Sequence, residues 1–151
     1  MKTYILSLAV VLTIVSCKKK EAETATPTPV VVSTPVVTPV ATAGFKWTEN
    51  GGAEITADSS RFTAQYSTLI AFKGGSVKFE INLTAGTVAT YTIGTNNVLT
   101  LVGGGANHVA TGGSVVVTAN ASSKMSGTFD VTMNTGGFTN VKGAFTDVVI
   151  K

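Results

Sequence analysis

The chain contains few of the residues that cross-link small folds, bind metal ions in them or interrupt their strands. Its 151 residues contain one cysteine, Cys17, so an intramolecular disulfide is excluded. The one histidine, His108, cannot form a zinc or copper site by itself. All four prolines fall within residues 27–39, and charged residues make up only 13% of the chain, against roughly 25% in an average soluble domain. Low charge together with many β-branched residues predicts strands.

Positive charge is concentrated at the N-terminus. The formal net charge of the whole chain is +3, but residues 44–151 carry seven basic and six acidic side chains, a net charge of +1. A nucleic-acid-binding domain needs a basic face or stripe on its folded part. We therefore predict no nucleic-acid partner.

Residues 1–17 read MKTYILSLAVVLTIVSC, which is one lysine, an apolar run over Tyr4–Val15, and a small residue before the cysteine. These are the n-region, h-region and cleavage site of a secretory signal. The apolar run of 12 residues is shorter than the roughly 20 that a membrane-spanning helix requires. Residues 1–16 are therefore predicted to be a cleaved signal peptide.

The segment Ile14–Cys17 resembles the lipobox of bacterial lipoproteins. The resemblance implies that the signal is cut before Cys17, that the Cys17 thiol is diacylated, and that its new amino group is acylated. Because one acyl chain anchors only marginally, two or three chains make a lasting membrane anchor. The run Ser16–Glu21 resembles lipoproteins of the Bacteroidetes, which implies the outer membrane, at its periplasmic or cell-surface face. An ordinary signal peptide with a chance cysteine and an uncleaved short anchor are the alternatives.

Residues 17–43 are predicted to be the lipidated cysteine followed by a linker rich in threonine, proline and valine. Each proline biases its neighbour toward extended or polyproline II conformation, and no apolar face can form at this composition. Fully extended, such a linker holds a domain up to roughly 80 Å from the lipid. A proline-rich ligand for another module is the alternative, and the runs Val30–Val32 and Val36–Val37 could add a strand.

Residues 44–151 alternate apolar and polar side chains in short runs separated by glycine- and asparagine-rich turns. The clearest run places Val77, Phe79, Ile81 and Leu83 on one face of a strand. Turns recur every 8 to 15 residues, and no helix is required. The pattern predicts an all-β domain, an antiparallel β-sandwich, with a partly open β-barrel as the alternative.

A short internal repeat predicts one hairpin of this domain. Met125–Phe129 and Val141–Phe145 share an apolar, glycine, phenylalanine spacing and flank a turn at Asn134–Gly137. We expect the two segments to pair, with each glycine leaving room for a neighbouring ring.

The domain also resembles small all-β Bacteroidetes lipoprotein domains of unknown function. The residues that carry the resemblance are the strand Ala89–Gly94, the run Ser126–Phe129 and the ending Gly143–Val148. The resemblance implies a β-sandwich and brings no activity with it.

Reactive groups are few. The sequence has no GxSxG, GxxxxGK or DxDxDG motif, so no catalytic residue, metal or cofactor is predicted. Asp130 and Asp147 lie on the predicted hairpin, and a glycosidase would need such a pair roughly 5–10 Å apart. Both occupy outward positions, which favours solvated surface, and we expect His108 at the surface or in a turn.

Stacking of aromatic side chains on a sugar is the remaining mode of binding that the sequence allows. Trp47, Tyr66 and Tyr91 are the candidate ligand-contact aromatics, although core packing is the more common role of such rings in a small domain. We expect a lipid-anchored, non-catalytic binding or accessory module with an envelope protein or glycan as partner. A structural surface or envelope-complex subunit is the alternative, and a carboxylate-dependent glycoside hydrolase is less favoured.

Overall fold

A computed structural model describes residues 44–151, in which ten strands and one 3-10 turn occur and no α-helix. The predicted signal peptide (1–16) and linker (17–43) lie outside the described residues. The part of the chain that the structure describes contains no helix with the length and hydropathy of a transmembrane span. The elements are β1 (Gly44–Glu49), β2 (Ile55–Thr56), β3 (Ser59–Thr63), η1 (Ala64–Tyr66), β4 (Thr68–Lys73), β5 (Ser76–Asn82), β6 (Ala89–Thr92), β7 (Val98–Gly103), β8 (Ala106–Ala121), β9 (Lys124–Met133) and β10 (Asn140–Ile150).

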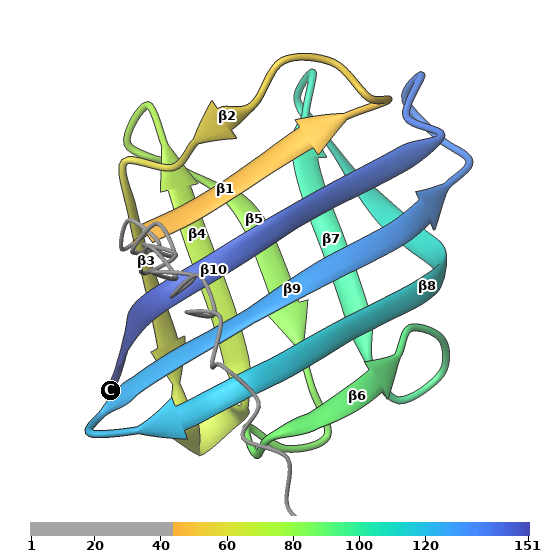
Figure 1. Cartoon of the computed structure of the whole chain (residues 1–151). Coiled ribbons are helices and arrows are strands. Elements are labelled where there is room, and N and C mark those ends of the chain that lie inside the picture. Colours follow the sequence, from red (N-terminus) through yellow and green to blue (C-terminus); the bar gives the residue numbers. More distant parts are fainter. Residues whose placement is uncertain (1–43) are drawn as a thin grey trace, which may run out of the picture. The chain divides into compact units, whose positions relative to one another are not determined.

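Seven of the strands close into a barrel in the order β3-β4-β5-β7-β8-β9-β10, and β10 returns to β3. In Figure 1, β1, β10, β9 and β8 run diagonally across the front, and β3, β4, β5 and β7 run more steeply behind them. The all-β prediction is confirmed. The sandwich is wrong because one continuous sheet forms both layers, and the barrel alternative is the architecture observed.

The barrel closes through a very short parallel contact. Every other strand pairing is antiparallel, whereas β10 pairs with β3 in parallel, through Val149 with Arg61 and Ile150 with Phe62. Earlier along the same edge, β10 pairs with β1 over six residues. One edge of β10 is therefore shared by two strands that come from different layers.

The strand β8 likewise pairs along one edge with two different strands, on the opposite side of the barrel. Its first residues pair with β7, and from Ser114 onward the same edge pairs with β6. A register shift between Ala110 and Gly112 marks the corner, where Gly113 has φ +102°. A Cβ atom on Gly113 would overlap the carbonyl oxygen of Asp130 on β9. Bulges bend a strand and increase its twist, which lets one strand serve both layers.

Aromatic rings fill the interior of the barrel. Phe45 lies at the centre of the cluster, with ring centroids 5.2 Å from Phe79 and 5.4 Å from Phe129. Trp47 meets Phe79 edge to face at 5.0 Å. Phe45, Phe79 and Phe145 are fully buried. Each buried ring removes a large apolar area from water, so this cluster is the main contribution of the core to stability.

The predicted hairpin is confirmed together with its packing. Gly143 lies opposite Phe129, and Gly127 lies opposite Phe145 in the β9-β10 pairing. A Cβ atom on Gly143 would overlap the Phe129 ring and the carbonyl oxygen of Lys46. Each glycine thus makes room for the ring across the strand, and Gly143 also lets β1 approach β10 closely, whereas Gly127 lets β8 approach β9.

We expect Gly143→Ala to destabilise the domain by at least about 2 kcal/mol, because the added methyl group has no free space in an already packed core. Gly112→Ala on β8 is the matched control, since a Cβ atom there meets nothing within 4 Å and its backbone is not left-handed. Urea unfolding of the two variants measures the difference. Equal stability of the two variants would contradict the interlocked packing.

Candidate functional site

The three predicted contact aromatics do not assemble into one surface. Trp47 is 1% exposed and its indole Nε1 donates to Glu49 Oε1 at 2.9 Å. Tyr91 is 6% exposed and its hydroxyl donates to the Thr87 carbonyl oxygen at 2.7 Å. Tyr66 alone is exposed, at 68%, on η1. Trp47 and Tyr91 are therefore core residues, which corrects their prediction as contact residues.

Asp130 and Asp147 are exposed, as predicted, and lie apart. Asp130 is directly opposite Lys142, five positions before Asp147 on β10. At about 3.3 Å per residue this separation is roughly 15 Å, beyond the roughly 5–10 Å of a glycosidase pair. Each carboxylate also faces a lysine, with Lys142 Nζ 2.8 Å from Asp130 Oδ2 and Lys124 Nζ 3.4 Å from Asp147 Oδ2.

The position of His108 differs from the expected surface position. It is 9% exposed, and its ring lies 5.1 Å from that of Phe138. Its Nε2 is 3.1 Å from the Gly103 carbonyl oxygen, and its Nδ1 is 3.3 Å from Thr135 Oγ1. Gly136, with φ +69°, passes directly over the ring. The burial comes from the β9-β10 loop folding over β8, a contact that no local pattern indicates.

Asn50 holds the other side of this loop, a role that the sequence reasoning missed. Its side-chain amide donates to the Gly137 carbonyl oxygen at 2.8 Å and accepts from the Thr139 backbone amide at 2.8 Å. Asn50 adopts φ +52°, which asparagine tolerates better than most residues. The available signal was the Asn50–Gly52 turn, although its partner 87 residues away could not be read from it.

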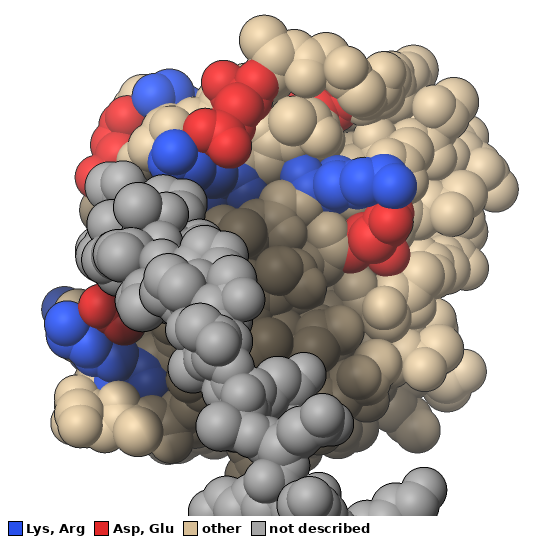
Figure 2. Space-filling view, viewed as in Figure 1, with Lys and Arg blue, Asp and Glu red and all other residues tan. Residues whose placement is uncertain are grey.

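Mostly polar side chains cover the solvent side of the layer β1-β10-β9-β8-β6. We call this surface the outer face and define it by two cross-strand rows of side chains that share one side of the sheet. The rows are Thr48, Lys142, Asp130, Ser114 and Thr92, and Lys46, Ala144, Thr128, Val116 and Thr90. Figure 2 shows this side, with charged groups across its upper part, at the left margin and right of centre, and a recessed, uncharged surface below the charged groups at the centre.

The outer face carries hydroxyl, ammonium and carboxylate groups and few large apolar side chains. Neighbouring strands lie about 4.8 Å apart, so Ser114 and Thr92 present adjacent hydroxyl groups next to Asp130 in the first row. Its one carboxylate, Asp130, receives hydrogen bonds from Lys142 and Asn140, which hold its pKa below the usual value of 3.8. An ionised, paired carboxylate is not a general acid at neutral pH.

Comparisons with protein-family models, with curated proteins and with solved structures found no match for this chain.

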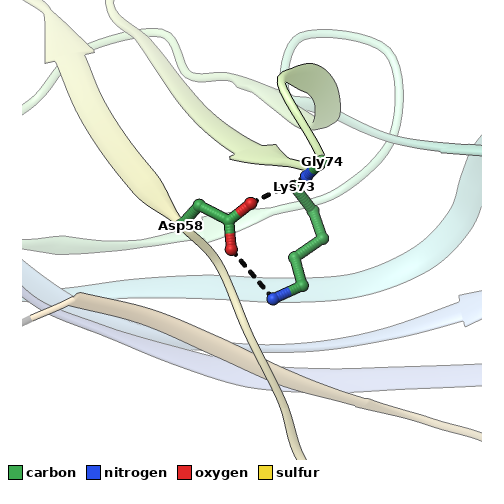
Figure 3. A network of polar contacts seen from close by, with 3 residues as sticks. All are labelled: Asp58, Lys73 and Gly74. Atoms are coloured by element: carbon green, nitrogen blue, oxygen red, sulfur yellow. Dashed lines mark hydrogen bonds and ion pairs between the residues drawn. The ribbon is translucent and has the colours of Figure 1, made fainter.

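A separate carboxylate, Asp58, ties the start of β3 to the β4-β5 turn (Figure 3). Its Oδ1 lies 2.9 Å from Lys73 Nζ, and its Oδ2 accepts from the Gly74 backbone amide at 2.7 Å. The hydrogen bond from Lys73, followed by that from Gly74, lowers the pKa of Asp58 below 3.8.

Because the folded-state pKa of Asp58 is the lower one, its contribution to stability is present above the unfolded-state pKa near 3.8 and is lost as the pH falls through the folded-state value. We expect wild type to lose stability between about pH 5 and pH 2 more steeply than Asp58→Asn. Urea unfolding across this range measures the slopes. Lys73→Met should raise the pKa of Asp58 in a carboxylate NMR titration, and an unchanged pKa there would refute the assignment of its cause.

Proposed function

We propose that the mature protein begins at Cys17 and is held at the outer membrane by acyl chains, where it acts as a non-catalytic binding or accessory module of the cell envelope. The observation that carries the proposal is the apolar run Tyr4–Val15 ending at Ser16 and Cys17. A 12-residue run fits a cleaved signal better than a span, and a cysteine at its end supplies the thiol for lipidation.

The outer face is the surface that we assign to the partner. The interior of the barrel is occupied by packed rings such as Phe45 and Phe79, so a ligand must bind to the outside of the domain. The outer face offers hydroxyl groups, the Lys142–Asp130 ion pair, Lys46 paired with Glu54, and few large apolar groups. A polar partner, an envelope glycan or the hydrophilic surface of an envelope protein, matches this chemistry.

Cys17→Ala should move the protein from the membrane fraction to the soluble fraction and abolish incorporation of labelled palmitate, because the acylated thiol is lost. The domain should keep its thermal midpoint, since Cys17 lies outside residues 44–151. Ser16→Ala is the matched control, because it keeps a small residue before the cysteine. Membrane retention of Cys17→Ala without label would rule out the lipid anchor.

The same strains test the contact surface. Thr128→Glu places a charge in the middle of the outer face and should reduce cross-linking of the anchored protein to envelope glycan or protein at least ten-fold. Val77→Glu on β5, in the other layer, is the control, since Val77 is also partly exposed. Equal cross-linking of both variants would remove the outer face as the contact surface and leave the anchor standing.

A further inference from the structure

A second surface feature lies where the barrel closes. The two-residue pairing of β3 with β10 leaves a cavity of about 230 Å³. We call it the seam pocket. It is lined by Ser59, Ser60, Arg61, Phe72, Val149 and Lys151. The preceding register shift between Phe145 and Val148 turns the end of β10 and leaves the side chain of Val149 47% exposed there.

Arg61 is held in place within this pocket. Its guanidinium carbon lies 4.9 Å from the centroid of the Phe72 ring. Phe72 comes from β4, and its neighbour in the register is Ser59, so ring and guanidinium project from adjacent strands. A guanidinium resting on an aromatic face is pre-oriented and weakly hydrated, which favours planar, two-pronged binding of an anion.

Among residues 44–151, no carboxylate lies within ion-pair distance of the two basic side chains of the pocket, Arg61 and Lys151. The acidic side chains that flank the lining residues are engaged elsewhere, Asp58 with Lys73 and Asp147 with Lys124. A half-buried guanidinium in a cavity, with its donors available, is the arrangement that an anionic ligand completes.

We propose that the seam pocket binds a phosphate monoester or diester group. Arg61 would supply a bidentate pair of donors, Lys151 a second charge, and the hydroxyl groups of Ser59 and Ser60 further donors. Phe72 and Val149 form an apolar wall for the carbon atoms next to the phosphate. The cavity is smaller than the roughly 300–1,000 Å³ of sites for drug-sized ligands, which restricts the recognised part to a small group.

This chemistry fits either a phospholipid headgroup or a soluble sugar or glycerol phosphate. The described chain starts beside the seam, because Gly44 pairs with Thr146, three residues before Val149. The proposal does not depend on the lipid anchor, since the pocket consists only of residues from the barrel. A failure of anion binding would therefore leave the anchor and the outer face unaffected.

The test uses residues 17–151 with Cys17→Ser, titrated with glycerol 3-phosphate at constant ionic strength and observed by amide NMR. We expect saturable shifts confined to residues 59–61, 72 and 149–151. Arg61→Gln should weaken binding at least ten-fold, and Arg61→Lys should weaken it less, because charge remains but the planar fork is lost. Lys78→Gln is the matched control, as Lys78 also makes no ion pair within residues 44–151.

Two results would overturn the proposal: chemical shift changes that do not saturate, or equal weakening of glycerol 3-phosphate binding by Lys78→Gln and Arg61→Gln. Either result indicates that the phosphate is attracted to the positive charge of the domain in general and not to the seam pocket. Retained amide dispersion shows that the Arg61 variants are folded. Sedimentation with phosphatidylcholine vesicles, with and without phosphatidylglycerol, then separates the two sources. Binding that needs phosphatidylglycerol and Arg61 identifies a headgroup, whereas binding of glycerol 3-phosphate alone identifies a soluble phosphate ester.

Discussion

The structure depends on the fit of two phenylalanine rings over two glycines in the β9-β10 hairpin. Phe129 lies over Gly143 and Phe145 over Gly127, so each ring occupies the space that the glycine on the paired strand leaves free. The same gap lets the backbone of β1 reach β10 and brings Phe45 into the ring cluster. The pairing of β9 with β10 and the packing of their rings in the core therefore depend on each other.

Because aromatic side chains fill the interior of the barrel, a ligand can bind only at the surface of the domain. Barrels of this strand number have little room inside once aromatic side chains point inward, so the binding surfaces of this domain are its outer face and its seam. The two differ in chemistry. The outer face presents hydroxyl groups around the Lys142–Asp130 ion pair, whereas the seam holds Arg61 against Phe72 without a carboxylate partner. The first suits a broad polar contact, and the second suits a single anionic group.

Local patterns predicted the strands well. Alternation around Phe79 and Ile81 found β5, and the repeated glycine and phenylalanine spacing found both the hairpin and its packing. These features depend on residues close in sequence. The candidate site was harder to predict, because whether Trp47 or Tyr91 is buried depends on strands that arrive from elsewhere in the chain.

Closure of the barrel could not be predicted for a physical reason. The bulge in β10 gives Asp147 φ +53° and makes Val148 the next buried residue after Phe145. That shift directs Val149 and Ile150 toward β3. Aspartate adopts the left-handed region more often than most residues do, but this preference is too weak to predict the bulge from the sequence. A parallel pairing of only two residues leaves no recognisable pattern in the sequence. The burial of His108 under Gly136 likewise joins β8 to the distant β9-β10 loop.

Native-state amide hydrogen exchange on the mature chain measures most directly whether this hairpin holds the barrel together. The amides of Gly127–Phe129 and Gly143–Phe145 that donate to neighbouring strands should exchange slowest among residues 44–151. Their opening free energies should equal that of global unfolding, because the rings cannot leave the glycines without opening the core. Fast exchange of these amides by local opening, while β4 and β5 stay protected, would contradict the central role of the β9-β10 interlock.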